Sequence, residues 1–344
     1  MTAARYAGNG TIVVGEDGTD PPGPGEVRLA VAYTGICGTD LHVLHGAMDH
    51  RVRVPQVIGH EMAGRIEAVG ESVTGWAAGQ PVTVMPLEWC GRCPACRAGH
   101  RHICHRLSFV GIDAPGSMQT TWNVPAHLLV ALPEDLPLPH AALVEPTAVA
   151  VHDVRRAALV AGERVVVIGG GPVGVLVALV AGAAGADVLL VEINEHRRAV
   201  ADRLGLTTLD PDRGDVAAHV QTWTAGAGAA AVFEVSGAEA AVTTAVDLLA
   251  VRGRLVVVAI HGQPRAVNLH RFFWRELTML GARVYERADF ERAVDLIHGR
   301  QIPVEALISA VIPIGDAPSA FRALAGGGAV MKVLVDCQDT RGPR

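Results

Sequence analysis

The segment VVVIGGGPVG, residues 165–174 of this 344-residue chain, is the part of the sequence most informative about its architecture. Its apolar first half is typical of a buried strand, and the apolar residues that follow it predict a helix. Glycines spaced GxGxxG directly between a strand and a helix allow a tight turn and let a pyrophosphate approach the helix N-terminus. The residues expected to bind a dinucleotide here are Gly169, Gly171, Pro172, Val173 and Gly174.

An acidic residue follows at the end of the next predicted strand. Glu192 lies 18 residues beyond Gly174 (192 − 174). A carboxylate at this spacing accepts hydrogen bonds from the adenosine ribose and repels a 2′-phosphate, which favours NAD over NADP. Arg197, a further cofactor-binding candidate, and Arg198 follow closely and are able to hold such a phosphate. NADP therefore stays open, as does an α/β domain that binds no nucleotide.

The glycine turn lies within a segment, residues 148–280, in which short apolar strands alternate with Ala-rich helical stretches. This alternation is the signature of βαβ units around a doubly wound parallel sheet, so we expect an α/β domain here. The strands predicted in it are residues 164–169, 187–192, 230–235 and 254–260.

The residues on either side of that segment have a different texture. Residues 1–147 are rich in Gly and Pro and contain short β-type runs, for example at 26–34 and 64–70, which predict a compact, mostly β domain. Residues 281–344 contain a predicted helix at 288–300 and a closing strand at 332–337. This tail is too short to fold alone, so we expect it to return to the first domain and make that domain discontinuous.

Composition excludes several classes of protein. Hydrophobic residues make up 50% of the chain and charged residues 19%, with a net charge of −6, as in a folded, soluble protein. A mildly acidic chain without basic runs predicts no nucleic-acid or anionic-membrane partner. The apolar run at 165–186 is broken by glycines and Pro172, which indicates a strand, turn and helix instead of a membrane span. No secretory signal precedes it, so a cytoplasmic location is expected.

Lysine is almost absent from the chain. Of 29 basic residues, 28 are arginines and one is Lys332. A phosphate-binding loop that ends in Lys-Ser/Thr is therefore excluded. A Schiff-base enzyme would have to use Lys332, which lies inside the strand-like segment AVMKVLV. The sequence therefore argues against Schiff-base chemistry.

Four cysteines in one turn-rich loop predict a structural zinc site. The loop WCGRCPACRAGHRHICH carries Cys90, Cys93, Cys96 and Cys104, and four thiolates form a closed tetrahedral site for zinc. Disulfides are an alternative that a cytoplasmic chain seldom keeps. An iron–sulfur cluster is another, although the last gap is longer than in ferredoxins. The loop histidines at 100, 102 and 105 are possible substitute ligands.

A second set of metal-ligand residue types lies upstream of that loop. Cys37 occurs in GICGTDLH, and His60 and Glu61 occur in VIGHEMAG. Thiolate, imidazole and carboxylate are the ligands of an open catalytic zinc site. Each fragment alone is also compatible with a core cysteine or a polar histidine, and a nucleophilic Cys37 served by His42 is conceivable. The sixth cysteine, Cys337, is most simply a core residue.

These motifs, in this order and together with VEP at 144–146, resemble the zinc-dependent medium-chain alcohol and polyol dehydrogenases. The HE pair and the segment 276–297 resemble the sorbitol, butanediol and threonine dehydrogenase branch. The resemblance implies a GroES-like catalytic domain (1–147 and 281–344) and a Rossmann cofactor domain (148–280), with the active site between them. It implies Cys37, His60 and Glu61 as zinc ligands, with Glu145 where classical alcohol dehydrogenases use a cysteine.

The resemblance also implies roles for the residues that follow Cys37. Asp40 is similar to the acid that orients the zinc histidine. Thr39 is similar to the hydroxyl that contacts the substrate oxygen, and His42 to the relay that carries the proton to solvent. Glu61 and Glu145 are both candidates for the carboxylate ligand, and a turn-stabilising Thr39 and an exposed, idle His42 are the simpler alternatives.

The predicted function is a zinc-dependent oxidoreductase that moves hydride between a secondary alcohol and NAD, giving the ketone. The alcohol is expected to be a vicinal diol, polyol, amino alcohol or cyclitol, and two zinc ions per chain are expected, one catalytic and one structural. An L-threonine 3-dehydrogenase is an alternative within enzymes. A non-catalytic NAD-sensing protein that keeps the fold and the structural zinc is the alternative from another class. The family resemblance implies a homotetramer or homodimer.

Overall fold

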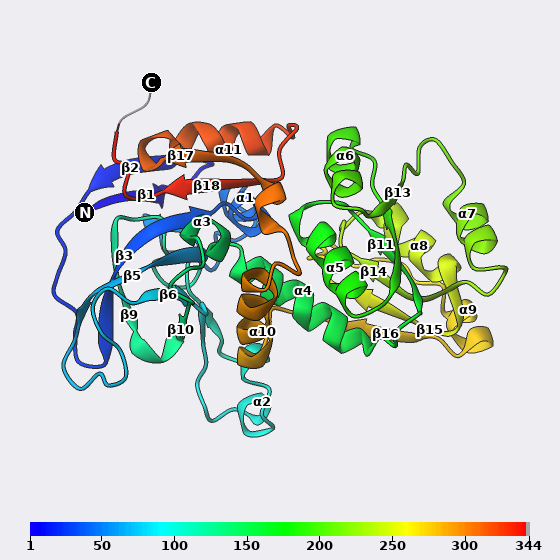
Figure 1. Ribbon diagram of the computed structural model, residues 1–344, viewed down its shortest axis with the longest axis horizontal. Helices are drawn as coiled ribbons and strands as arrows, with labels where there is room; N and C mark the ends of the chain where they lie inside the picture. The colour runs from blue at the N-terminus through cyan, green and yellow to red at the C-terminus, as the bar shows by residue number, and fades with distance from the viewer. Residues whose placement is uncertain (342–344) are drawn as a thin grey trace. The chain divides into compact units, whose positions relative to one another are not determined.

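The computed structural model describes residues 1–341, which divide into two compact units (Figure 1). Among the described residues, the first unit contains residues 1–145, 286–300 and 307–341, and the second contains residues 146–285 and 301–306. The predicted division placed residues 146–147, 281–285 and 301–306 in the first domain. Residues 281–285 group with the second unit because Ala282 continues the sheet pairing there, donating its N–H to the Val257 carbonyl at 3.1 Å.

The first unit is built around a seven-stranded, mostly antiparallel sheet. Its strands run in the order β10-β6-β5-β3-β18-β17, and β9 also pairs with β3. Smaller sheets are β2-β1-β4 and β7-β8. The strands of this unit are β1 (Thr2–Tyr6), β2 (Ile12–Glu16), β3 (Glu26–Gly35), β4 (Gln56–Val57), β5 (Glu61–Val69), β6 (Pro81–Val84), β7 (Leu87–Glu88), β8 (Ser108–Phe109), β9 (Thr121–Pro125), β10 (Leu129–Ala131), β17 (Ile308–Pro313) and β18 (Lys332–Asp336).

Short helices connect these strands. The helices are α1 (Gly38–Leu44), α2 (Pro94–Arg97), η1 (Arg101–Ile103), η2 (Ala126–Leu128), α3 (Leu138–Ala141), α10 (Arg287–His298), η4 (Ile314–Asp316) and α11 (Ala317–Ala325). The helix predicted at 288–300 and the strand predicted at 332–337 correspond to α10 and β18. The last strand pairs antiparallel with β3, with Leu334 opposite Gly35. Residues close to the C-terminus are thereby brought to the end of β3.

The second unit has the predicted parallel sheet, with strand order β13-β12-β11-β14-β15-β16. The reversal of order between β11 and β14 is the point at which doubly wound sheets bind ligands. Its elements are α4 (Val144–Ala157, which begins in the first unit), β11 (Arg164–Ile168), α5 (Pro172–Ala183), β12 (Asp187–Val191), α6 (Glu195–Arg203), β13 (Thr207–Leu209), α7 (Val216–Trp223), β14 (Ala229–Glu234), α8 (Glu239–Leu248), β15 (Leu249–Val257), α9 (Leu269–Arg275), β16 (Thr278–Gly281) and η3 (Val304–Leu307).

The four strands predicted in this unit are present, and two more, β13 and β16, extend the sheet at its edges. Both are short, three and four residues, and neither has the long apolar run of the central strands. The apolar run at 165–186 folds as the expected strand, turn and helix. Among the described residues, no helix has the length and apolarity needed to cross a membrane.

Candidate active site and metal centres

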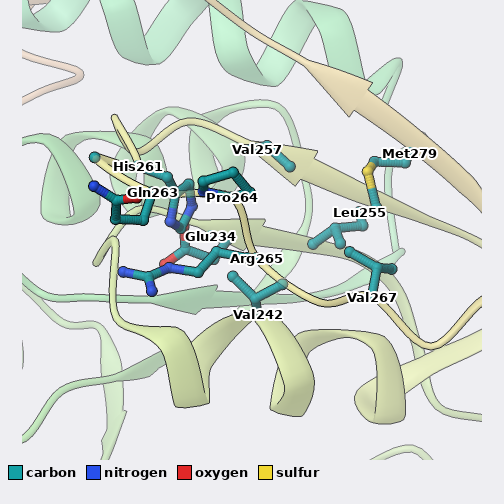
Figure 2. A pocket seen from close by; sticks show the side chains of 11 residues that line it. Glu234, Val242, Leu255, Val257, His261, Gln263, Pro264, Arg265, Val267 and Met279 are labelled. Atoms are coloured by element: carbon teal, nitrogen blue, oxygen red, sulfur yellow. The ribbon is translucent and has the colours of Figure 1, made fainter.

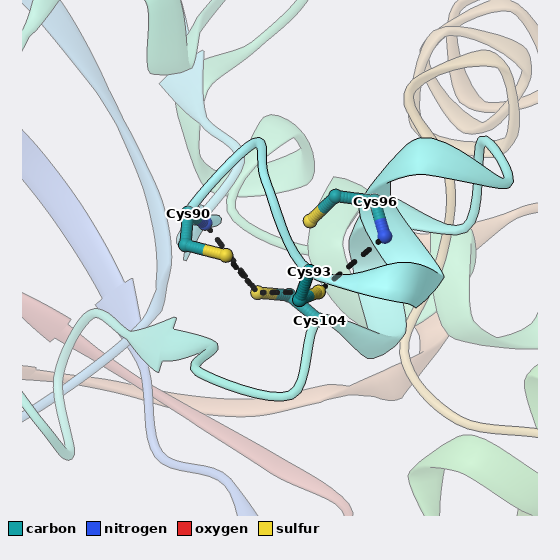
Figure 3. Close-up of side chains that lie close together, drawn as sticks. All are labelled: Cys90, Cys93, Cys96 and Cys104. Carbon is teal, nitrogen blue, oxygen red and sulfur yellow. Dashed lines mark hydrogen bonds between the residues drawn. The ribbon is translucent and has the colours of Figure 1, made fainter.

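The four cysteines of the loop between β7 and β8 converge (Figure 3). The sulfur of Cys104 lies 3.6 Å from that of Cys90 and 3.8 Å from that of Cys93. Zinc–sulfur bonds of about 2.3 Å in a tetrahedron place the sulfurs about 3.8 Å apart, so these separations fit one zinc ion. They are too long for disulfides, whose sulfurs lie about 2.05 Å apart.

The backbone around this cluster favours thiolates. The N–H groups of Cys90 and Arg106 donate to the sulfur of Cys104 at 3.4 and 3.3 Å. Backbone hydrogen bonding, chiefly at Arg92, lowers the pKa of Cys90 to about 6. Since zinc binds the deprotonated form of cysteine, this favours metal binding at Cys90, whereas burial raises the pKa of Cys96 to about 12. His102, one of the possible substitute ligands, instead lies 3.5 Å from Glu286.

The second predicted cluster also forms. Ligand atoms of Cys37, His60 and Glu61 all lie within 4.8 Å of one another. Cys37 is the N-cap of α1, directly after β3, and the histidine and glutamate stand at the start of β5. Gly35 pairs with Glu61 across these strands, and a Cβ at Gly35 would lie 2.1 Å from the Glu61 Oε2 atom. Glycine is therefore required here to make room for the carboxylate.

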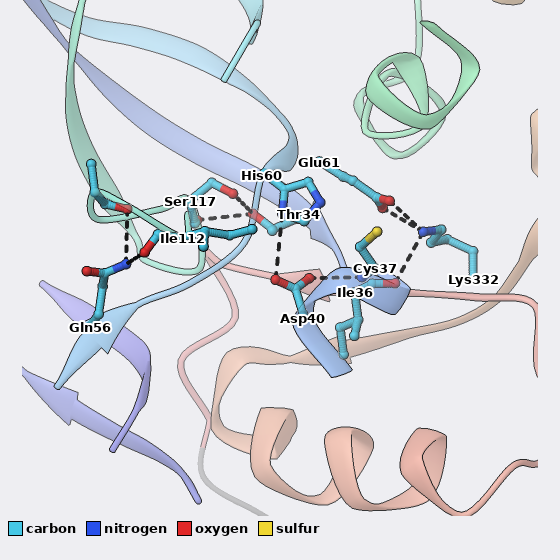
Figure 4. A network of polar contacts seen from close by, with 11 residues as sticks. Thr34, Ile36, Cys37, Asp40, Gln56, His60, Glu61, Ile112, Ser117 and Lys332 are labelled. Carbon is cyan, nitrogen blue, oxygen red and sulfur yellow. Dashed lines mark hydrogen bonds and ion pairs between the residues drawn. The ribbon is translucent and has the colours of Figure 1, made fainter. Parts of the chain in front are cut away.

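Asp40 is fully buried and has two functions in this cluster (Figure 4). Its Oδ2 accepts the Cys37 N–H at 2.9 Å and so caps α1. Its Oδ1 faces the Nδ1 of His60 at 3.6 Å, and neither atom has another partner among the described residues. Burial works against a charged imidazole, but the charges of Asp40 and Cys37 outweigh it and raise the pKa of His60 well above its usual value. The Asp40 carboxylate thus lies beside the Nδ1 edge of the His60 ring.

Glu61 has a partner that the sequence did not predict. The Nζ of Lys332 donates to both carboxylate oxygens of Glu61, at 2.8 and 2.7 Å, and to the Ile36 carbonyl at 3.2 Å (Figure 4). Burial disfavours the ammonium, but the charges of Glu61, Cys37 and Glu145 outweigh it and raise the pKa of Lys332. The signal available in the sequence was a lone lysine in an otherwise apolar strand.

The remaining candidates of the first unit take different positions. Glu145 is buried and its charge helps to raise the pKa of His60, but it is not part of the three-residue ligand cluster. Thr39 is half-buried on α1, and His42, on the same helix, is exposed. These positions are compatible with the roles that the family resemblance implied for Thr39 and His42.

The glycine turn of the second unit has the geometry of a phosphate-binding site. Gly169 has φ of +107°, in the left-handed region, and a Cβ there would lie 2.9 Å from the Ser236 nitrogen. A Cβ on Gly174 would lie 1.8 Å from the Gly169 oxygen, so helix and strand pack only with glycine. At Gly171 the nearest atom to such a Cβ is 3.9 Å away. This glycine leaves open space at the N-terminus of α5, which has no side-chain cap.

Glu192 lies beside this turn, as predicted, and is buried. Its Oε2 accepts the Gly170 N–H at 2.5 Å and its Oε1 accepts the Asn194 N–H at 2.7 Å. Arg198 is committed elsewhere, because it donates to the Glu192 carbonyl at 2.7 Å and pairs with Asp210 at 2.8 Å. The guanidinium of Arg197 is 3.9 Å from Glu192 and partly exposed.

A cavity of about 440 Å³ lies in the second unit beside α8 and β15 (Figure 2). At its polar end the buried carboxylate of Glu234 meets the Nε2 of His261 at 2.9 Å. The same carboxylate accepts the N–H groups of Ser236 and Gly237, at 3.0 and 2.9 Å. None of the predicted cofactor residues lines this cavity. The sequence did not single out Glu234 or His261.

Comparisons with known proteins agree with this architecture. Residues 23–134 match the alcohol dehydrogenase GroES-like domain, and residues 172–299 match the zinc-binding dehydrogenase domain. The chain is 50% identical to a 2-dehydro-3-deoxy-L-galactonate 5-dehydrogenase of Pseudoalteromonas atlantica, over 98% of this chain and 99% of the relative.

Two solved structures are similar over nearly their full length. The 2R,3R-butanediol dehydrogenase of Bacillus subtilis has a TM-score of 0.89 and 29% identity, covering 97% of this chain and 99% of that chain. A putative zinc-binding dehydrogenase from Sinorhizobium meliloti, bound to NADP, has a TM-score of 0.92 and 31% identity, covering 97% and 98%.

The chain belongs to the zinc-dependent medium-chain alcohol and polyol dehydrogenase family. The resemblance drawn from the motifs, the fold class and the prediction of an oxidoreductase are thereby confirmed. Zinc and a nicotinamide nucleotide as cofactors agree with the matched domain and with the NADP-bound neighbour. None of these three relatives is named a threonine dehydrogenase, so the alternative of an L-threonine 3-dehydrogenase gains no support from them.

Proposed function

We propose that the chain is a zinc-dependent dehydrogenase that transfers hydride between a secondary alcohol and NAD, with the ketone as the oxidised product. The observation that carries this proposal is the convergence of Cys37, His60 and Glu61 within 4.8 Å. Sulfur, nitrogen and oxygen donors in this combination are those of a catalytic zinc that keeps a position open. A non-catalytic NAD-binding protein has no need for such an intact set.

Two zinc ions per chain are part of the proposal, one at Cys37, His60 and Glu61 and one at the four-cysteine loop. When bound at the first site, zinc supplies Lewis acidity that makes a substrate hydroxyl easier to deprotonate. Asp40 holds the His60 ring in place. Thr39 and His42 on α1 form the proton path: the Thr39 hydroxyl receives the released proton while its own proton passes toward His42, and exposed His42 gives up one proton to solvent. Glu145 is proposed as a second candidate for the carboxylate ligand of this zinc.

NAD is proposed over NADP because of Glu192. Its buried carboxylate lies beside the glycine turn, where a 2′-phosphate would be repelled. Glu192→Ala is expected to lower kcat/KM with NAD roughly tenfold or more, since a hydrogen bond to a charged group contributes about 1.5–3 kcal/mol. The NADP to NAD ratio of kcat/KM should rise, aided by Arg197. An unchanged ratio in steady-state kinetics would contradict the assignment.

The substrate is proposed to be a polyhydroxy acid of the 2-dehydro-3-deoxy type, oxidised at a secondary hydroxyl. Support comes from the relative that is 50% identical over nearly the whole length. A cytoplasmic location and the association of identical chains into a homotetramer or homodimer complete the proposal.

The test is an assay of NAD reduction with purified protein. 2-Dehydro-3-deoxy-L-galactonate, 2,3-butanediol, sorbitol and L-threonine are compared at equal concentration, and zinc is measured by elemental analysis. We expect the sugar acid to be oxidised most efficiently and about two zinc ions per chain. Zinc only at the four-cysteine loop, with no oxidation of any of these alcohols, would support the non-catalytic alternative.

A further inference from the structure

Lys332 is a buried cation at the proposed catalytic metal site. It is the one lysine of the chain, and both Lys332 and Glu61 are almost completely buried, at 2% and 0% exposure. The pairing of β18 with β3 brings it there, because the Val333 carbonyl accepts the Ile36 N–H at 3.0 Å. The ammonium therefore stands next to the end of β3, where Cys37 follows.

The contact is specific for the carboxylate of Glu61. Both oxygens lie 2.7–2.8 Å from the ammonium nitrogen, and the Ile36 carbonyl accepts a third hydrogen bond at 3.2 Å. A buried ammonium is costly unless it is paired and fully hydrogen-bonded, and here all three protons have acceptors. One oxygen of the same carboxylate is the atom that Glu61 offers to a metal. One carboxylate thus faces two cation sites.

We propose that Lys332 is a positioning residue that competes with the metal for Glu61 and keeps this carboxylate a displaceable ligand. The inference rests on the proposed function, since it needs a metal at Cys37, His60 and Glu61. A fixed positive charge against the ligand oxygens weakens their attraction for a second cation. It also gives Glu61 a partner when the carboxylate leaves the metal, so that no buried charge is left unpaired. An ordinary buried ion pair would stabilise the fold without affecting metal binding.

The test compares zinc loss from the purified holoenzyme and from Lys332→Met. Excess chelator is added, and zinc release is followed with a colorimetric indicator. Cys37→Ser identifies the phase that belongs to the catalytic site, because this variant lacks that phase. Because Lys332→Met removes the positive charge that competes for Glu61, we expect release in this phase to be roughly tenfold slower, within the 10–100-fold range over which residues behind a metal ligand alter metal affinity. Lys332→Arg, which keeps the charge, should release zinc at the wild-type rate.

A second readout tests whether the effect passes through Glu61. In the Glu61→Gln background, Lys332→Met should no longer slow zinc release. The neutral amide carries no charge for which the Lys332 ammonium and the zinc ion could compete. The visible spectrum of the cobalt-substituted enzyme should change in Lys332→Met and be restored in Lys332→Arg. If Lys332→Met does not fold, Lys332→Gln, which keeps a donor without the charge, should show the same slowing.

Unchanged or faster zinc release from folded Lys332→Met or Lys332→Gln would overturn the inference, as would an equal effect in the Glu61→Gln background. These results are distinct from a failure of the proposed function. If wild-type protein shows no zinc-release phase that depends on Cys37, the metal site itself is wrong. If that phase is present but insensitive to Lys332, only the role of Lys332 is wrong.

Discussion

Asp40 shows how a single buried side chain links local structure to the proposed chemistry. One of its oxygens caps α1 at Cys37, and the other faces His60. Residues behind a metal ligand set the orientation and tautomer of the ligating imidazole. A carboxylate that already ends a helix is therefore well placed to orient a histidine from the neighbouring strand.

Asp40→Asn tests that role. The amide still accepts the Cys37 N–H, but it presents a donor where His60 needs an acceptor. We expect kcat/KM to fall about 10–100-fold, with the fold intact by circular dichroism. Asp49→Asn is the matched control, because Asp49 is exposed and accepts a hydrogen bond from Tyr6. Equal activity of the two variants would exclude an orienting role for Asp40.

The two cysteine sites are expected to separate by function. Cys37→Ser should abolish turnover and leave the melting temperature close to that of the wild type, because it removes one ligand of an open site. Cys93→Ser should instead lower the melting temperature and release the zinc of its loop, since closed zinc sites contribute directly to folding. Elemental analysis and thermal melts check both. Full activity of Cys37→Ser would overturn the assignment of the catalytic metal.

At the scale of elements, the strand–turn–helix at β11 and α5 uses its glycines for different purposes. A Cβ at Gly174 would collide with the turn itself, whereas a Cβ at Gly171 would have only the Arg197 Nη1 atom nearby, at 3.9 Å. The first position is therefore a packing requirement of the element. The second keeps the helix N-terminus accessible to a pyrophosphate.

This difference predicts opposite outcomes for two alanine variants. Gly174→Ala should lower the melting temperature by several degrees, because backbone must move. Gly171→Ala, at φ of −65°, should melt like the wild type but bind NADH at least about tenfold more weakly, since close backbone approach to the pyrophosphate needs glycine. Thermal melts and NADH fluorescence titration measure both effects. Wild-type affinity in Gly171→Ala would place the cofactor elsewhere.

At the scale of the whole molecule, the second unit exposes apolar surface at one edge of its sheet. On α9, Leu269, Phe273 and Trp274 are 74%, 76% and 68% exposed. Strand β16, which forms the sheet edge next to β15, is exposed at Thr278 and Met279. Exposed aromatic side chains and an exposed edge strand are typical of protein interfaces. They support the proposed association of identical chains.

The double substitution Phe273→Glu and Trp274→Glu is expected to dissociate the oligomer, because it places charges in this apolar surface. Sedimentation velocity should show a dimer or tetramer for the wild type and a smaller species for the variant. Val160→Glu is the control, since Val160 is 64% exposed in the same unit but outside this surface. A wild-type monomer, or an unchanged mass for the double variant, would contradict the assignment.

Local motifs could be predicted from the amino-acid sequence alone. The glycine turn, the four-cysteine loop and the Cys37 and His60–Glu61 motifs were all predictable, because backbone geometry and metal-ligand spacing act over a few residues. The short edge strands β13 and β16 were not, since their stability comes from sheet pairing and not from a strong apolar pattern.

Contacts between side chains that are distant in sequence were not predictable and became visible in the folded chain. Lys332 pairs with Glu61 across 271 positions of sequence, and Arg198 pairs with Asp210. The Glu234–His261 pair likewise joins the end of β14 to the loop that follows β15. Such contacts depend on strand pairing and burial, which change the energy of a charge but leave no periodic signal in the chain.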